Sequence, residues 1–162
     1  MLPLDAHAGS VVIIGQSAFV DDATLGGGGS SKVTALYTVA PLDGMRNVLD
    51  GLGSAAMVTK VTVADDLSNL DEAKQAAAHA DVVVPMVGLV ATEGADQADP
   101  NMLHDQNRML AELLGINPTT VVVLKDGNPV LMPWINAAPA RSRCGTRAPR
   151  TATSSPTCSS GS

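Results

Sequence analysis

Short runs of β-branched and aliphatic residues recur along the chain, and segments with helical spacing separate them. Each run is bounded by glycine or polar residues, which is typical of strands buried on both faces. The predicted strands cover residues 11–15, 57–63, 82–87 and 119–124. The predicted helices cover residues 42–49, 67–80 and 106–114. Strands that alternate with helices form parallel sheets covered on both sides, so the pattern predicts an α/β fold, a mostly parallel sheet flanked by helices in a three-layer sandwich.

Two local signals refine these elements. Ser68 is the predicted N-cap of the helix over 67–80, and Asp71 and Glu72 would then lie in its first turn, where carboxylates interact favourably with the helix dipole. The segment 125–129, Lys-Asp-Gly-Asn-Pro, predicts a turn directly after the fourth strand. The chain therefore reverses or steps sideways there, and the apolar run 130–132 need not pair with the strand before it.

Composition and charge exclude several classes of protein. A chain of 162 residues with 45% hydrophobic content is long enough for one domain and too short for two. All 16 acidic residues stand at or before Asp126 against six basic ones, so residues 1–140 carry about −10 of formal charge. An acidic body argues against nucleic acid as a partner. No run is apolar enough for a membrane span or a signal peptide, which predicts a cytoplasmic location by default.

The residues that usually carry metals, redox chemistry or phosphates give weak signals. Cys144 and Cys158 have the spacing of neither a disulfide framework nor a metal site, and the three histidines have no partner pattern, so no metal or cofactor is predicted. The glycine run 26–29, followed by two serines, fits a linker, a phosphate loop or a loop packed against another domain. It lacks the spacing of nucleotide-binding motifs.

Several segments, in order, resemble the C-terminal domain of glycoside hydrolase family 3 enzymes of the β-glucosidase type. The likeness covers residues 2 to 140 almost continuously, and its most specific part is Thr92-Glu93-Gly94-Ala95-Asp96, which resembles the acid/base loop of the family. The other matching segments are Leu2-Pro3-Leu4-Asp5, 11–15, 26–30 with Val33-Thr34, Pro41-Leu42-Asp43-Gly44, Gln106, Asn117-Pro118, 121–124 and 127–134, the last ending in a Pro-Trp turn.

The resemblance implies a flavodoxin-like fold and a role in a retaining, exo-acting β-glycosidase that hydrolyses O-glycosyl bonds. In such an enzyme an Asp from an N-terminal (β/α)8 barrel attacks the anomeric carbon, while a Glu of this domain acts first as acid and then as base. Glu93 matches that catalytic Glu. Asp96 matches the Asp of the same motif, which contacts sugar hydroxyls or orders the loop. The expected partners are thus a β-glucoside substrate and a barrel domain, which this chain does not contain.

Departures from the family pattern keep other functions open. Leu89 stands where the family commonly has Glu, Gln97 where it has Arg, and the segment 103–105 lies near the place of a Leu-Pro-Gly. A non-catalytic remnant or carbohydrate-binding module with the same fold is the first alternative. A nucleotide-binding α/β domain is the second, supported only by fold class and the glycine run, and fold class is a poor warrant for function.

The last 22 residues differ in composition from the rest. Residues 141–162 contain no large apolar residue and no acid, so we expect a disordered, low-complexity tail after a domain over 1–140, which is then incomplete at its C-terminus. The family resemblance suggests an origin: a GC-rich Tyr-Pro-Gly segment of the family, read one base late, yields the sequence of Cys144 to Gly161. We therefore hypothesise a frameshift near Arg141, the alternative being a natural Ser/Thr-rich tail.

Overall fold

The computed structural model describes residues 8–23, 34–91, 94, 97 and 99–145. In the described part of the chain, five strands and four helices follow one another in the alternating order that the apolar runs predict. They are β1 (Ser10–Gln16), α1 (Ser17–Val20), α2 (Pro41–Gly51), β2 (Met57–Val63), α3 (Leu70–His79), β3 (Val82–Gly88), α4 (Gln106–Ile116), β4 (Val121–Asp126) and β5 (Ala140–Gly145).

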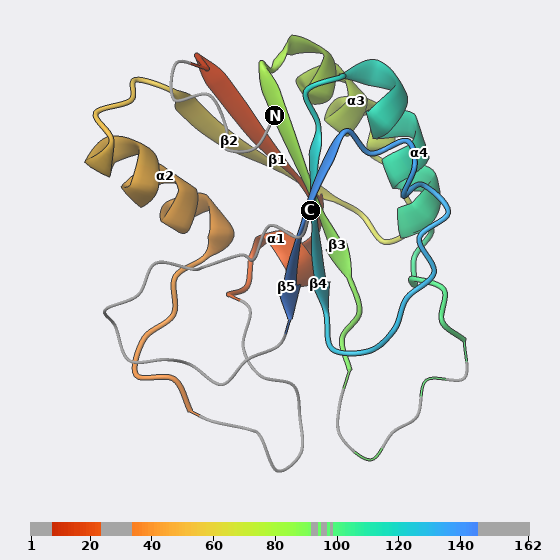
Figure 1. Ribbon diagram of the computed structural model, residues 1–162. Helices are drawn as coiled ribbons and strands as arrows, with labels where there is room; N and C mark the ends of the chain where they lie inside the picture. Colours follow the sequence, from red (N-terminus) through yellow and green to blue (C-terminus); the bar gives the residue numbers. More distant parts are fainter. Residues whose placement is uncertain (1–7, 24–33, 92–93, 95–96, 98, 146–162) are drawn as a thin grey trace.

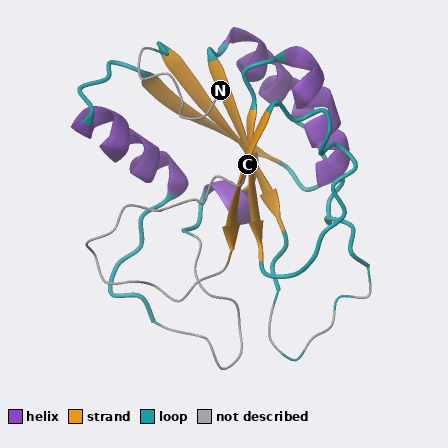
Figure 2. Ribbon diagram, in the orientation of Figure 1, coloured by secondary structure: helices purple, strands orange, loops and turns teal. Residues whose placement is uncertain are grey.

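The strands form one parallel sheet with the order β2-β1-β3-β4-β5. Helices α3 and α4 cover one face of this sheet, while α1 and α2 lie on the other (Figure 1; Figure 2). This strand order is that of flavodoxin-like doubly wound folds. The predicted three-layer α/β/α sandwich is therefore confirmed.

Alternating side chains of the strands divide the core into two clusters. In β1, Val12 and Ile14 pack with the residues under α3 and α4, whereas Val11 and Ile13 pack toward α1 and α2. All four are at most 3% exposed. A strand buried on both faces has no polar positions, and this is why the run reads as continuously apolar rather than alternating.

The helix α3 begins later than predicted and without the expected cap. Its N-cap is Asn69, not Ser68, and no side chain caps the first turn. The amide of Asn69 instead accepts a hydrogen bond from Ala64 N at 2.8 Å and donates one to Thr62 O at 3.0 Å. Asn69 therefore closes the turn between β2 and α3. The carboxylates of Asp71 and Glu72, in the first turn of α3, interact favourably with the helix dipole.

Asn117 ties the C-terminal end of α3 to the start of β4. Its Nδ2 donates to the carbonyls of Ala77 at 3.0 Å and Ala80 at 2.7 Å, and its Oδ1 accepts from Thr119 N at 2.7 Å. Asn117 is 8% exposed, so these bonds satisfy backbone groups that have little access to water.

The sheet continues past the predicted end of the domain at residue 140. Strand β5 pairs in parallel with β4 from Val121↔Ala140 to Asp126↔Gly145. An edge strand needs backbone hydrogen bonds on one side only, so a segment without large apolar residues can still pair. Arg141 and Arg143 are exposed there, consistent with an edge position. Residues 146–162, the remainder of the predicted tail, lie outside the described residues.

Candidate functional site

The strand order creates a cleft at the carboxyl ends of β1 and β3. The chain leaves β1 toward the face covered by α1 and α2, and it leaves β3 toward the α4 face, so the two connections diverge. Open α/β sheets bind ligands at such a topological switch point. The cleft has a volume of about 380 Å³, within the usual range of ligand sites. Its lining residues are Gln16, Ser17, Ala18, Phe19, Asp22, Asp65, Gly88, Leu89, Val90, Leu103, His104 and Gln106.

Gln106 closes the floor of the cleft by bonding the backbone of β3. Its Oε1 accepts from Gly88 N at 2.8 Å, and its Nε2 donates to Gly88 O at 3.0 Å and Leu103 O at 3.0 Å. The pairing of β1 with β3 ends at Gly15↔Met86, two residues before Gly88, so the side-chain amide of Gln106 bonds backbone groups of β3 that lie beyond this pairing. Gln106 is 1% exposed, and it fixes the start of α4 against the end of β3.

Gln16 fixes the opposite wall through the loop before α4. Its Nε2 donates to His104 O at 2.9 Å, which joins the end of β1 to a loop 88 residues later. Gln16 is 2% exposed, and its Oε1 has no hydrogen-bond partner among the described residues. The loop itself is strained, because His104 and Asp105 have φ values of 56° and 50°. Left-handed backbone is unfavourable for residues other than glycine.

Carboxylates and one imidazole give the cleft its polar character. Asp22 lies after α1, and Asp65 lies after β2. The Nε2 of His104 is 3.8 Å from Oδ2 of Asp65, with side chains 48% and 66% exposed, so this contact is weak. Among the described residues that line the cleft there is no lysine or arginine. The cleft is therefore rich in hydrogen-bond acceptors and poor in positive charge.

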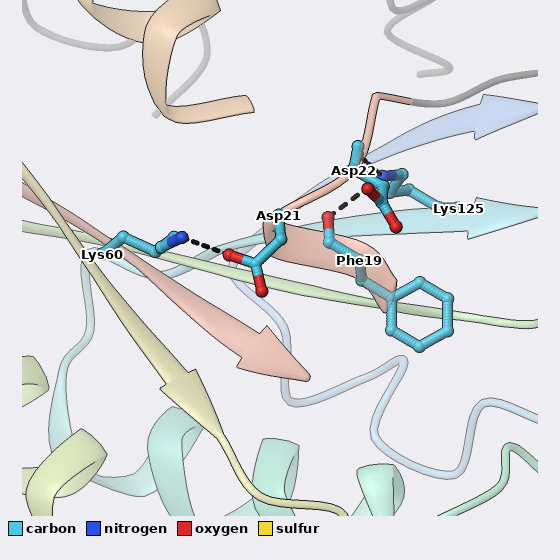
Figure 3. Close-up of polar contacts among 5 residues, drawn as sticks. All are labelled: Phe19, Asp21, Asp22, Lys60 and Lys125. Carbon is cyan, nitrogen blue, oxygen red and sulfur yellow. Dashed lines mark hydrogen bonds and ion pairs between the residues drawn. The ribbon is translucent and has the colours of Figure 1, made fainter. Parts of the chain in front are cut away.

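Two lysines from different strands hold the short helix α1 in place (Figure 3). Lys125 of β4 is 7% exposed and donates to the carbonyls of Phe19 at 3.0 Å and Asp22 at 2.8 Å, at the C-terminal end of α1. Lys60 of β2 forms an ion pair with Asp21. The hydrogen bond from Lys60 lowers the pKa of Asp21 below its ordinary value. Because Phe19 and Asp22 also line the cleft, these lysines fix one of its walls.

The end of β4 carries a buried carboxylate. Asp126 is 1% exposed, its Oδ1 accepts from Arg143 Nε at 2.8 Å, and its Oδ2 has no partner among the described residues. The hydrogen bond to Asp126 raises the pKa of Arg143 above its ordinary value. The pair joins β4 to β5, and it does not line the cleft.

The two predicted site residues, Glu93 and Asp96, lie outside the described residues. Their neighbours Leu89 and Val90 are described: Leu89 is 6% exposed and Val90 is 82% exposed, and both line the cleft. Gly94 has a φ of 77° and Gln97 is exposed.

The sequence interpretation missed Gln16, Asp65 and the role of Gln106 in the cleft. Gln16 directly follows the predicted strand 11–15, and Asp65 comes two residues after the predicted strand 57–63. A position at the carboxyl end of a parallel strand is the signal that could have found both residues. His104, which has no partner pattern in the sequence, is half exposed and lines the cleft.

Neither a metal-binding cluster nor a membrane-spanning helix occurs in the described part of the chain. No group of three or more His, Cys, Asp or Glu side chains in this part of the chain could hold a metal ion. Within the same residues, no helix is long and apolar enough to cross a membrane.

The fold and the cleft define a flavodoxin-like α/β domain with a site at its switch point, and comparison with known proteins gives the family. The profile of the glycosyl hydrolase family 3 C-terminal domain matches residues 1–143. The chain therefore belongs to this family, whose enzymes are glycoside hydrolases.

Individual relatives agree with the family. The chain is 32% identical over 146 residues to thermostable β-glucosidase B of Acetivibrio thermocellus, and 34% identical over 107 residues to a putative β-glucosidase of Schizosaccharomyces pombe. These alignments cover 84% and 64% of this chain, but only 18% and 12% of the relatives. The chain therefore spans less than a fifth of the length of these curated relatives.

Solved structures give the same fold. The β-glucosidase of Kluyveromyces marxianus in complex with glucose superposes with a TM-score of 0.75 at 15% identity, over 89% of this chain and 36% of that one. A family 3 β-glucosidase of Bifidobacterium adolescentis superposes with a TM-score of 0.67 at 27% identity, over 86% of this chain and 21% of that one.

Proposed function

We propose that this chain supplies the acid/base half of a retaining β-glycosidase, with Glu93 as the acid and then the base. The match to the family over residues 1–143 carries the proposal. The cleft supports it, because Leu89 and Val90 line the cleft and Glu93 follows Val90 by three residues.

The chemistry requires a second carboxyl group besides that of Glu93. Retaining hydrolysis needs two carboxyl groups about 5 Å apart, one as nucleophile and one as acid/base. The nucleophile would come from a (β/α)8 barrel domain, and the substrate would be a β-glucoside bound between the two. The names of the relatives, which are β-glucosidases, support this substrate class. On its own the chain would show no appreciable turnover, since no glycosyl-enzyme intermediate could form.

The test is hydrolysis of aryl β-glucosides by the chain alone and mixed with a separately produced barrel domain of a family member. We expect activity only in the mixture, and Glu93→Gln should lower it by about 10² or more. Glu72→Gln on α3 is the matched control, because Glu72 is exposed and does not line the cleft. Its activity should equal that of the wild type.

The leaving group separates acid catalysis from a merely structural effect. A phenol with a low pKa departs without protonation, so loss of the acid should slow poor leaving groups more than good ones. A uniform loss over all aryl glucosides would argue against Glu93 as the acid.

A non-catalytic carbohydrate-binding or interaction module is the second candidate. The specific observations that favour it are Leu89, buried in the cleft wall where the family commonly has Glu, and Gln97 in place of Arg. An exchange of Arg for Gln removes a fixed cation from the acid/base loop. Binding of a glycoside without hydrolysis in any mixture would support this candidate.

A further inference from the structure

Strand β2 forms one edge of the sheet, and its backbone groups alternate between the two sides (Figure 1). Among the described strands, β2 pairs with β1 alone, and Met57 N donates to Gly9 O at 2.9 Å. In a parallel strand the N–H and C=O of one residue point to the same side, and those of the next residue point to the other side. Met57 and every second residue after it therefore bond β1. The backbone groups of Val58, Lys60 and Thr62 point away from the sheet.

Two side chains from opposite faces of the sheet occupy acceptors of this outer edge. Arg46 of α2 donates from Nη2 to Val58 O at 2.9 Å. Asn69, the N-cap of α3, donates from Nδ2 to Thr62 O at 3.0 Å. Of the three outward carbonyls, only that of Lys60 accepts no hydrogen bond from another described residue. The edge is therefore closed at both ends and open in the middle.

The outward groups of β2 are complementary to those of a second copy in the antiparallel direction. In an antiparallel ladder, two residues of a hydrogen-bonded pair exchange both N–H···O bonds. If Lys60 faces Lys60 of the second copy across a two-fold axis, Val58 faces Thr62, and every outward N–H and C=O of the three residues finds a partner. The two lysines are like charges, but each forms an ion pair with Asp21 of its own chain.

This register uses the same carbonyls that the two side chains occupy. The carbonyls of Val58 and Thr62 would accept all of its hydrogen bonds except those to Lys60, and Arg46 and Asn69 already bond both. Two copies could pair only after these bonds are broken. The edge is thus complementary to itself, but it is blocked.

We propose that the outer edge of β2 is a pairing surface whose partner is a second copy of this chain, and that Arg46 and Asn69 keep it closed. Strand edges with free backbone groups are templates for pairing with other chains, and proteins protect them with charged side chains and other devices. Here the protection consists of hydrogen bonds to the acceptors themselves. Loss of either side chain would open the edge. This proposal is independent of the proposed function.

The test compares the wild type with Arg46→Met, which keeps an unbranched side chain and loses the donor. Molar mass from light scattering over a range of concentrations gives the Kd of the dimer, and NMR gives hydrogen exchange of the Lys60 amide. We expect the Lys60 amide of the wild type to exchange freely. In Arg46→Met the Kd of the dimer should fall by about tenfold or more, and the Lys60 amide should be protected in the dimer. Arg108→Met is the matched control, because Arg108 is exposed and bonds only Glu112 of its own helix among the described residues. It should behave like the wild type.

Two further substitutions separate edge pairing from other association. Asn69→Ser frees Thr62 O from the other face and covers the case in which Arg46→Met does not fold, since serine is also a good N-cap. Lys60→Pro, added to Arg46→Met, removes an outward N–H that the monomer does not use, and it should restore the monomer. Lys60→Met in the same background loses the same charge but keeps the N–H, so it should remain dimeric.

Three results would overturn the proposal. The first is that folded Arg46→Met and Asn69→Ser stay as monomeric as the wild type. The second is that they associate while the Lys60 amide stays unprotected, or that the dimer persists with Lys60→Pro, because the contact would then lie elsewhere. The third is a wild type that already dimerises with a protected Lys60 amide, since Arg46 and Asn69 would then not close the edge.

Discussion

Replacement of Gly88 by alanine should destabilise the whole sheet, because no space exists for a methyl group at this position. A Cβ on Gly88 would lie 1.8 Å from the carbonyl oxygen of Lys125 and 2.6 Å from its carbonyl carbon. Both atoms belong to the backbone of β4, so no side-chain rotation can relieve the overlap. Strands β3 and β4 would have to separate by more than 1 Å at this pair.

The magnitude follows from the hydrogen bonds that such a shift would break. Leu89 N donates to Lys125 O at 3.0 Å, and the amide of Gln106 makes two bonds to Gly88 on its other side. A net contribution of about 1 kcal/mol for each bond, with buried groups left unpaired, gives a loss of roughly 3–5 kcal/mol. Domains are stable by only about 5–15 kcal/mol, so Gly88→Ala should be marginally folded.

Urea unfolding followed by the fluorescence of Trp134 measures this loss. Trp134 is the single tryptophan and is 4% exposed, with its Nε1 donating to Asn107, so its emission should report unfolding. The controls are Gly51→Ala and Gly115→Ala, whose added Cβ atoms would meet nothing within 4 Å in α2 and α4. These should stabilise by about 0.5–1 kcal/mol. A Gly88→Ala protein within 1 kcal/mol of the wild type would refute the argument.

Other contacts give further predictions. His104→Gly should be more stable than His104→Ala by about 0.5–1 kcal/mol in urea unfolding, because only glycine relieves the positive φ. Asn117→Ala should lose about 2–4 kcal/mol by the same measurement, since its three hydrogen bonds serve buried groups. The midpoint of urea unfolding should be higher for the wild type than for Lys60→Met at pH 6, and the two midpoints should be equal near pH 2. The lowered pKa of Asp21 stabilises the fold above the unfolded value of about 3.9, and this gain is lost as pH falls through the folded value.

Each of these outcomes has a control. His104→Ala removes the same imidazole as His104→Gly, so equal stabilities would show that the left-handed backbone costs nothing. Asn101→Ala is the control for Asn117→Ala, because Asn101 is exposed and its side chain donates to the nearby Asp99 rather than to a buried backbone group. A difference between wild type and Lys60→Met that stays constant with pH would contradict the role of Asp21.

The regular elements could be predicted from the sequence, whereas their ends could not. Strands buried on both faces are visible as apolar runs, and the four predicted runs all became parallel strands. The cap of α3 was misplaced because Ser68 and Asn69 are both good caps, and the choice depended on which side chain could reach the backbone of the preceding turn. Strand β5 was missed because its pairing depends on the free edge of β4 rather than on its own composition.

The candidate site divides in a similar way. Glu93 and Asp96 are predictions from a local motif and remain so. The cleft depends on contacts between distant segments, such as Gln16 with the carbonyl of His104 and Gln106 with Gly88. The end of a predicted strand could have placed Gln16 near the cleft, but a glutamine in a sequence carries no sign of the partner that it will meet, so the hydrogen bonds of neither residue could be assigned in advance.

The sequence by itself determined the alternation of strands and helices, the two-sided burial of the sheet, the acidic charge of the body and the family. These properties are set by neighbours in the chain and by composition. Only the tertiary structure decided that β1 lies beside β3, that the chain diverges there into a cleft, and that an oxygen of Gln16 has no hydrogen-bond partner among the described residues. Such features arise where residues far apart in sequence compete for the same space and the same hydrogen bonds, and this competition is settled only when the sheet is assembled.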